Sequence, residues 1–299
     1  MKVLITGGSG LIGNRITKLL LEQNTEVVHL TRHRNSKSGV KTYEWNWENG
    51  TIDFKCFSDV THIIHLAGAG IADRAWTTKQ KRFLVKSRVH TTRLLFEYVQ
   101  SLDKLEAFIS ASGIGYYGAR NSEEIFTEES LPYGDFIAKC CIQWEKAADL
   151  FKPVSRVVKL RTGIVLDKEH GAIPKMSSSI KKGLGAPLGN GNQYMPWIHI
   201  DDIAQLYIHA LKSDMKGVYN AVSNQHTTNR DFTLEHAAQL NKKIRLKKIP
   251  PFFIKTIYGE MADLFLTGSR VSNDKLLASG FEFKYPDLKG ALENIFTNK

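Results

Sequence analysis

Short apolar runs and longer amphipathic segments alternate along the first 165 residues of the chain. The apolar runs have the length and the β-branched content of buried strands, and they cover residues 2–6, 26–31, 61–66, 105–111 and 154–160. The amphipathic segments have the spacing of helices with one apolar face, and they cover residues 11–23, 79–101 and 135–151. This alternation predicts an α/β fold, with a Rossmann-type doubly wound parallel sheet over residues 1–165.

The pattern loosens after residue 165. The elements expected there are a short helix within the Gly-, Pro- and Ser-rich stretch 171–191, a strand over 197–200, and helices over 201–211 and 229–240. Asp201 or Asp202 is expected to cap the first of the two longer helices. Two aromatic-rich segments follow Pro250. We expect residues 166–299 to complete the core and to form a small C-terminal substrate lobe.

The composition is ordinary for a globular protein in water, with 42% hydrophobic and 24% charged residues. The N-terminus lacks the features of a secretory signal, and no apolar run approaches the ~20 residues that a membrane span needs. We therefore expect a cytoplasmic protein without a membrane partner. The three cysteines, Cys56, Cys140 and Cys141, fit a reducing compartment. Metal-ligand spacings are missing from the sequence, so we expect no metal site.

The net charge is +11, and the densest basic run covers residues 241–248. Basic and apolar residues alternate in this run, as on a half-exposed strand. Such a surface suits a nucleic acid or a membrane, or it is a solvated face of a protein that handles anions. No nucleic-acid-binding motif accompanies the run. We therefore favour the solvated face and expect no nucleic-acid partner.

A glycine-rich turn joins the first strand to the first helix. Gly7, Gly10 and Gly13 form the pattern GxxGxxG within TGGSGLIG. In such a turn one glycine lets the chain reverse, another lets the backbone approach a pyrophosphate, and the third lets the helix pack on the sheet. The pyrophosphate then binds at the helix N-terminus, here around Leu11 and Ile12. The turn therefore predicts a dinucleotide site, the alternative being a tight turn without a ligand.

The end of the second strand indicates which dinucleotide binds. An NAD-selective site usually has Asp or Glu about 20 residues after the glycines, where it binds the ribose 2′-hydroxyl. This strand ends in Thr31-Arg32-His33-Arg34, without an acid. The planar guanidinium of Arg32 suits a 2′-phosphate. We therefore expect NADP(H), with Thr31 and Arg32 at the phosphate, the alternative being a solvated basic loop.

Several motifs together resemble those of the extended short-chain dehydrogenases/reductases. The segments TGGSGLIG, LTR, HLAG, ISASGIGYYG, LRTGIVL and WIHIDDIA occur in the order typical of that family. The closer similarity is to an atypical, NAD(P)-dependent epimerase-like branch, the YfcH-type proteins. The marks of that branch are IADRAWTTKQK (71–81), SRVHTTRLL (87–95), ASGIGYYG (111–118), the loop 183–189 and GEMADLFLTGSRV (259–271). The resemblance covers nearly the whole chain and includes a family-specific C-terminal segment of about residues 248–296.

The resemblance implies roles for further residues. Arg88 stands where extended members usually have an Asn on the central helix, facing the cofactor. The other implied positions are Leu66, Ala67 and Gly68 beside the adenosine half of the cofactor, Gly163 and Ile164 at the nicotinamide end, and Trp197 and His199 in the substrate lobe.

The chain departs from the family's catalytic pattern. Active members use a Tyr-x-x-x-Lys pair on the helix after the fifth strand, where the lysine lowers the pKa of the tyrosine for acid–base work. Here Lys139 has Asp135 four residues before it, and we expect Asp135 to cap the helix. The usual position of the polarising Ser or Thr holds Gly113, with Ser112 one residue earlier.

The catalytic candidates therefore come from the loop after the strand 105–111, because active-site residues gather beyond the carboxyl ends of such strands. They are Ser112, Tyr116 and Tyr117. The two tyrosines serve equally well as packing aromatics. His199 is a further candidate acid or base, which we expect to titrate near neutrality.

The favoured function is that of an NADP(H)-dependent reductase or epimerase. It would act by transient hydride transfer on a small substrate, nucleotide-linked or not. The missing Tyr-x-x-x-Lys pair favours a different function, that of a non-catalytic NADP(H)-binding or sensing protein. We expect a small molecule as the partner and leave a homodimer open.

Overall fold

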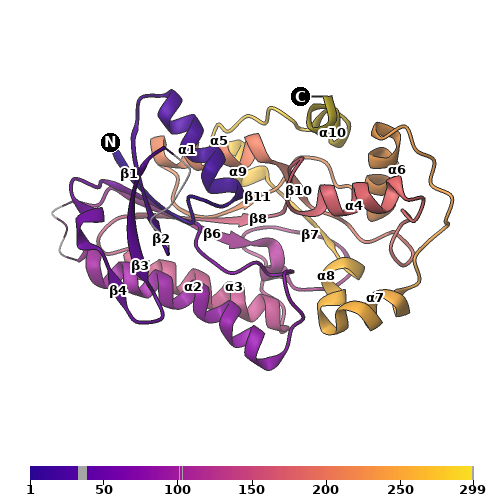
Figure 1. Ribbon diagram of the computed structural model, residues 1–299, viewed down its shortest axis with the longest axis horizontal. Helices are drawn as coiled ribbons and strands as arrows, with labels where there is room; N and C mark the ends of the chain where they lie inside the picture. The colour runs from indigo at the N-terminus through magenta and orange to yellow at the C-terminus, as the bar shows by residue number, and fades with distance from the viewer. Residues whose placement is uncertain (33–38, 101, 103, 298–299) are drawn as a thin grey trace.

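An eight-stranded sheet runs through the centre of the molecule (Figure 1). The computed structural model describes residues 1–32, 39–100, 102 and 104–297. The strands, in the order in which they lie side by side, are β11 (Gly217–Ala221), β8 (Arg156–Thr162), β6 (Ala107–Gly113), β5 (His62–His65), β1 (Lys2–Thr6), β2 (Glu26–Thr31), β3 (Lys41–Asn46) and β4 (Thr51–Ile52). Neighbouring strands are parallel, except that β3 and β4 form an antiparallel pair. The predicted Rossmann-type doubly wound sheet is confirmed.

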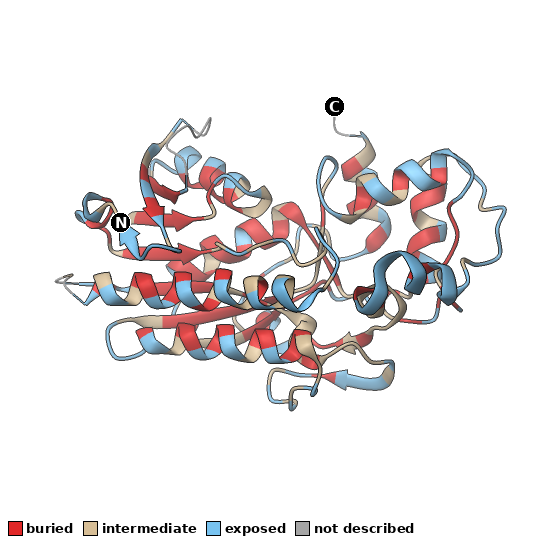
Figure 2. Cartoon of the chain, turned by 60° about the horizontal axis from the view of Figure 1, so that its bottom comes forward, coloured by how far each residue is buried: buried red, intermediate tan, exposed pale blue. Residues whose placement is uncertain are grey.

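Helices cover both faces of this sheet. One face carries α1 (Leu11–Glu22) and α5 (Ile200–Lys212), and the other carries α2 (Thr78–Val99) and α3 (Phe136–Ala148) (Figure 1). Side chains alternate between the faces of a strand, so Val3 and Ile5 of β1 pack into one core cluster and Leu4 packs into the other. Figure 2 shows the buried strands between helices whose outer sides are exposed. Burial on both faces explains why β1 is a continuous apolar run.

A second lobe lies beyond the carboxyl ends of the central strands (Figure 1). It contains two small parallel pairs, β9 (Ile164–Leu166) with β10 (Trp197–His199) and β7 (Ser122–Phe126) with β12 (Ser269–Val271). Its helices are α4 (Ala172–Lys181), α6 (Asn229–Gln239), α7 (Pro251–Tyr258), α8 (Asp263–Leu266) and α10 (Leu288–Thr297). The short helix α9 (Asp274–Ala278) instead packs on β11 of the central sheet. Short 3₁₀ turns are η1 (Phe54–Phe57), η2 (Ile114–Tyr117), η3 (Asp149–Phe151) and η4 (Gly259–Ala262). Trp197 and Phe232 lie in an apolar cluster formed with α4, α6 and α10.

Residues 241–248 do not form the half-exposed strand that their alternation suggests. They lie in an irregular segment between α6 and α7, with nearly every side chain exposed. The dense positive charge of this segment favours solvent over the close partner strand that a ladder requires. The prediction of a strand there is therefore wrong.

The cap of α5 also differs from the prediction. The helix begins at Ile200, and the ring of His199 caps it by accepting the N–H of Asp201 at 3.1 Å. Asp202 instead accepts two backbone N–H groups of a distant segment, those of Lys284 at 2.7 Å and Tyr285 at 3.1 Å. Asp202 thus ties the C-terminal segment to α5.

Among the described residues, no helix combines the length and the apolar content needed to cross a bilayer.

Candidate functional site

The three glycines of the GxxGxxG pattern between β1 and α1 lie in different settings. Gly7 has φ of +71°, and a side-chain carbon there would lie 3.0 Å from the carbonyl carbon of Leu66. A side-chain carbon at Gly13 would overlap the carbonyl oxygen of Gly7. At Gly10, in contrast, the one close neighbour among the described residues is that same oxygen, at 3.2 Å. Gly7 and Gly13 are therefore required by the fold, whereas Gly10 has this single tight contact and is open on its other sides.

The N-terminus of α1 faces this open space without a side-chain cap. Gly10 is the N-cap residue, and the first turn contains no acid. The first amides of a helix have no partner within the helix, so those around Leu11 and Ile12 are suited to donate hydrogen bonds to an anion. The positive end of the helix dipole adds to that preference.

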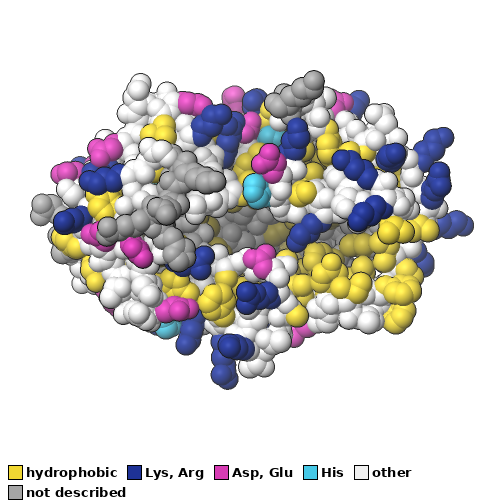
Figure 3. Space-filling model, in the orientation of Figure 1, with side chains coloured by type: hydrophobic (Ala, Val, Ile, Leu, Met, Phe, Trp, Pro, Cys, Tyr) yellow, Lys and Arg dark blue, Asp and Glu magenta, His cyan; other side chains and the backbone are white. Residues whose placement is uncertain are grey.

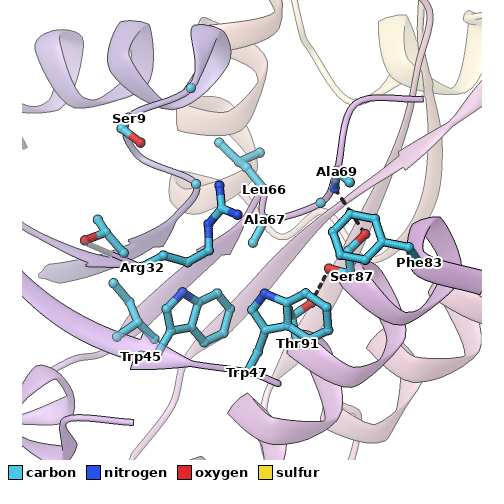
Figure 4. A pocket seen from close by; sticks show the side chains of 15 residues that line it. Ser9, Arg32, Trp45, Trp47, Leu66, Ala67, Ala69, Phe83, Ser87 and Thr91 are labelled. Atoms are coloured by element: carbon cyan, nitrogen blue, oxygen red, sulfur yellow. Dashed lines mark hydrogen bonds between the residues drawn. The ribbon is translucent and has the colours of Figure 1, made fainter. Parts of the chain in front are cut away.

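A cavity of about 260 Å³ opens beside the glycine turn (Figure 4). It lies at the carboxyl ends of β1, β2 and β5, where the strand order reverses and where open α/β sheets bind ligands. Residues predicted for the cofactor that line it are Gly7, Gly10, Thr31, Arg32, Leu66, Ala67 and Gly68. The remaining lining residues are Ser9, Leu30, Trp45, Trp47, Ala69, Phe83, Ser87 and Thr91.

Aromatic side chains form one wall of this cavity. Trp45 lies on β3, Trp47 follows it, and Phe83 lies on α2. The ring centroids of Trp47 and Phe83 are 5.9 Å apart, and both rings are partly exposed (Figure 4). Such a wall suits a flat heteroaromatic ring. The sequence analysis missed these residues, although the alternating aromatics of KTYEWNW (41–47) signal a strand.

Arg32 joins this cavity to a second one. The second cavity has a volume of about 450 Å³ and is also bordered by Arg32, together with Arg74 and Asp73. Two guanidinium groups at the border of one space suit an anion with the geometry of a phosphate. His33 and Arg34, from the same basic stretch, lie outside the described residues.

Arg88 supports the loop after β5 and lines neither cavity. Its guanidinium donates hydrogen bonds to the carbonyl oxygens of Ala69 at 2.9 Å and Leu84 at 3.0 Å. The same group stacks over the ring of Trp144, 4.9 Å from its centroid. Burial lowers the pKa of Arg88. The resemblance implied a side chain that faces the cofactor, whereas this side chain holds the loop that lines the cavity.

A buried polar cluster lies beyond the carboxyl end of β6. Ser112 Oγ donates to Glu145 Oε1 at 2.7 Å, and the two carboxylate oxygens of Glu145 accept from the Arg161 guanidinium at 2.7 and 2.9 Å. Arg161 also donates to the Tyr117 hydroxyl at 3.0 Å, and that hydroxyl donates to Asn220 Oδ1 at 2.6 Å. Each of these five residues is at most 7% exposed. Mutual hydrogen bonds in such a dry setting hold the ends of β6, β8 and β11 together.

The three catalytic candidates therefore differ in setting. The hydroxyls of Ser112 and Tyr117 are used within the buried cluster, and burial raises the pKa of Tyr117 to about 12. Tyr116 is partly exposed, and its ring lies over the Arg161 guanidinium, 3.3 Å from ring centroid to Cζ. Of the three candidates, Tyr116 is therefore the one whose side chain is not buried.

The first two turns of α3 face the end of β6 with apolar side chains. Asp135 caps the helix as predicted, accepting an N–H of the first turn at 2.8 Å, and Lys139 is exposed. A side-chain carbon at Gly115, just beyond β6, would touch both Ile137 and Cys141. Residues four apart share a helix face, so the pair that faces the end of β6 is Ile137 and Cys141. Burial raises the pKa of Cys141, so its thiol stays neutral.

The two side chains predicted for the substrate pocket are buried. Trp197 is fully buried, and its indole N–H donates to Thr227 Oγ1 at 3.1 Å. His199 is 2% exposed and lies 4.0 Å, between ring centroids, from Tyr285. Burial lowers the pKa of His199 to about 4, so the expectation that it titrates near neutrality is wrong. Both residues belong to β10, which runs through the interior, and neither lines the cavities described above.

Gly163 marks a close crossing of two backbone segments after β8. Its N–H donates to the Ala221 carbonyl at 3.1 Å, and a side-chain carbon would come within 2.6 Å of the Pro196 carbonyl oxygen. Ile164 follows at the start of β9 and is partly exposed. The crossing alone requires a glycine here, and the contact of Gly163 and Ile164 with the nicotinamide end stays a prediction.

Metal chemistry finds no support in the described part of the chain. It holds no group of three or more His, Cys, Asp or Glu side chains placed to share a metal ion. The three cysteines are free and buried.

Comparison with known proteins gives matches over most of the chain. Residues 3–222 match the NAD dependent epimerase/dehydratase family, and residues 249–295 match a domain of unknown function, DUF1731. The chain is 34% identical over 300 residues to the epimerase family protein SSP1921 of Staphylococcus saprophyticus, with 98% of each chain covered.

Solved structures share the architecture. The human epimerase family protein SDR39U1 with NADPH has a TM-score of 0.87 and 28% sequence identity, with 100% of each chain covered. A nucleoside-diphosphate sugar epimerase of Corynebacterium glutamicum has a TM-score of 0.79 and 27% identity, with 99% of this chain and 58% of that chain covered.

Proposed function

Because this chain belongs to the NAD dependent epimerase/dehydratase family, we propose that it binds NADP(H) and acts as an oxidoreductase or epimerase on a small, nucleotide-linked substrate. The observation that carries the proposal is the cavity beside the glycine turn. It joins an uncapped helix N-terminus, an aromatic wall and the guanidinium of Arg32. Those three features match a pyrophosphate, an adenine and a 2′-phosphate. Two relatives add support, one solved with NADPH and one named a nucleoside-diphosphate sugar epimerase.

Each part of the cavity has a separate task in this proposal. The open side of Gly10 lets the pyrophosphate reach the first amides of α1. Arg32 holds the 2′-phosphate with planar donors. Ser87 accepts the N–H of Ala69 at 3.1 Å, and Arg88 binds the carbonyl of the same residue, so the loop under the cofactor is fixed from behind. The bound nicotinamide would supply or accept the hydride.

The proton must be handled by a side chain near the end of β6. We assign this task to the hydroxyl of Tyr116, which would donate to or accept from the substrate oxygen. Ser112 and Tyr117 act as positioning residues. Tyr117 accepts a hydrogen bond from Arg161, which lies under the ring of Tyr116, and Ser112 binds Glu145, the ion-pair partner of Arg161.

A second candidate function rests on α3. Ile137 and Cys141 turn an apolar pair toward the end of β6, and neither exchanges protons at neutral pH. This observation favours a non-catalytic protein that binds or senses NADP(H). Turnover of NADPH with a panel of small carbonyl compounds and nucleotide sugars separates the two functions. Turnover that falls about 10²-fold in Tyr116→Phe supports the enzyme, whereas no turnover across the panel supports the sensor.

Cofactor binding is tested by titration with NADPH and NADH. NADPH should bind at least tenfold more tightly, a difference of ~1.4 kcal/mol, and Arg32→Asp should invert the preference. Arg93→Asp, on the exposed side of α2, makes the same charge change away from the cavity and should leave both affinities unchanged. Equal affinities of the wild type for the two cofactors would refute the choice of NADP(H).

A further inference from the structure

The helix α7 turns most of its apolar side chains toward solvent. Phe252, Phe253 and Ile257 are 64%, 52% and 69% exposed, whereas Ile254 is 7% exposed. At 100° per residue, the three exposed side chains span an arc of about 140°, and Ile254 lies about 60° beyond the edge that Ile257 forms. Thr256 lies within the same arc, and its hydroxyl donates to the Phe252 carbonyl at 2.9 Å. The outer face of α7 is therefore apolar, the reverse of an ordinary surface helix.

This helix is fixed in place at both ends. Before it, Ile249 donates to the Pro187 carbonyl at 2.8 Å and accepts from the Gly189 N–H at 2.9 Å. After it, Glu260 forms an ion pair of 2.5 Å with Lys81 at the start of α2. Because both ends are tied to other parts of the fold, the apolar face is held outward in a defined orientation.

The apolar face adjoins a dense group of cations. From Asn241 to Gly259 the sequence contains no Asp or Glu and six basic residues, Lys242, Lys243, Arg245, Lys247, Lys248 and Lys255. All six are exposed. Figure 3 shows Lys and Arg side chains along the right-hand edge of the molecule, next to the hydrophobic cluster at the lower right, over the part that Figure 1 labels α7. The charge and the apolar face thus form one continuous surface.

We propose that α7 and the basic segment 241–248 dock this protein onto an anionic lipid surface. Bulky apolar side chains on a helix of this kind enter the headgroup region, while nearby cations are attracted to acidic lipids. A second copy of the chain fits poorly, because a symmetric interface would bring the six cations of each copy together. The proposal replaces the solvated-face interpretation of the basic run. It also gives a role to the start of the domain of unknown function matched at residues 249–295.

Vesicle sedimentation tests the proposal with the full chain. The protein should pellet with vesicles of phosphatidylcholine mixed with phosphatidylserine, and not with phosphatidylcholine alone, and added salt should weaken binding. Phe252→Ser combined with Phe253→Ser should reduce the affinity for the mixed vesicles at least about tenfold. Lys247→Glu combined with Lys248→Glu should do the same. In each variant an unchanged melting temperature and NADPH affinity verify that the fold is intact.

Matched variants elsewhere on the surface serve as controls. Phe54→Ser removes an aromatic ring that is 53% exposed on η1, and Lys18→Glu with Lys86→Glu makes the same charge change on α1 and α2. Both should bind vesicles like the wild type. No binding to anionic vesicles, or equal binding by the α7 variants, overturns the proposal. A concentration-dependent dimer that the α7 variants abolish, without vesicle binding, assigns the surface to a second copy and overturns it as well.

Discussion

Gly10 provides a way to remove cofactor binding while keeping the fold. In Gly10→Val the new side chain would enter the open side of the glycine turn, where the pyrophosphate is proposed to lie. The backbone of Gly10, with φ −79° and ψ 174°, is extended and suits any L residue. Among the described residues, the nearest atom to an added side-chain carbon is the Gly7 oxygen at 3.2 Å. The Gly7 oxygen must therefore move by a few tenths of an ångström to admit this carbon, whereas a bound pyrophosphate would collide with it.

The substitution Gly10→Val should cost less free energy of folding than free energy of NADPH binding. For the fold, valine is a poorer N-cap residue than glycine, which costs about 1 kcal/mol. In a chain of this size that lowers the melting temperature by about 2–4 °C. For binding, each charge-assisted hydrogen bond to the pyrophosphate is worth about 1.5–3 kcal/mol. The loss of two such bonds weakens NADPH binding by more than about a hundredfold.

The assay pairs a thermal melt with NADPH titration for three variants. Gly10→Val should melt cooperatively and bind no NADPH in the micromolar range. Gly13→Ala should lose both the cooperative melt and NADPH binding, because its side-chain carbon overlaps the Gly7 carbonyl. Gly290→Ala in α10, where the nearest contact is 3.5 Å away, should change neither. NADPH affinity of Gly10→Val within a few-fold of the wild type would refute the close approach of a pyrophosphate to this turn.

Three further predictions address the aromatic wall, the polar cluster and the buried histidines. Trp47→Ala should weaken NADPH and NADH equally, by about tenfold, because adenine stacking is common to both; a loss confined to NADPH would contradict that role. Tyr117→Phe leaves Arg161 and Asn220 with an unpaired polar group, so the free energy of unfolding should fall by about 1–3 kcal/mol in denaturant titration, with NADPH affinity unchanged. Burial lowers the pKa of His29 to about 4 and that of His65 to about 3. Below pH 6.5 the unfolded chain therefore binds more protons than the folded one, and stability should decline from pH 7 to pH 5 by about 2 kcal/mol for each histidine; chemical unfolding that is independent of pH in this range would contradict it.

The first βαβ unit could be predicted from sequence because local signals and long-range packing agree there. The middle of β1, Val3 to Ile5, is apolar because β1 lies between β2 and β5 with helices on both faces. The glycines that follow it are dictated by close backbone contacts at Gly7 and Gly13. A strand, a turn and a helix that each require their own residues leave little freedom for a different fold.

Other parts of the site depend on contacts that no local pattern records. Trp45 and Trp47 line the cavity only because β3 lies beside β2, and this neighbour is set by the sheet order. His199 is buried because β10 passes through the interior of the lobe. Asp202 does not cap α5, because its carboxylate accepts backbone N–H groups of Lys284 and Tyr285, about 80 residues away in the chain.

The orientation of α3 shows how much depends on a single helix register. Counting back from Lys139 selects Asp135, but that residue caps the helix and Lys139 points to solvent. Two residues further along, Ile137 and Cys141 share the same spacing and face the end of β6. A hydride transfer between carbon atoms leaves a proton to be placed on the substrate oxygen, and an apolar pair supplies none. The proton must then come from the end of β6 or the turn η2 that follows it, where the hydroxyls of Ser112 and Tyr117 already serve the cluster around Arg161. For an enzyme, this arrangement requires the acid–base group to lie in the turn η2 and not on α3, and Tyr116 is the residue of that turn to which we assign the role.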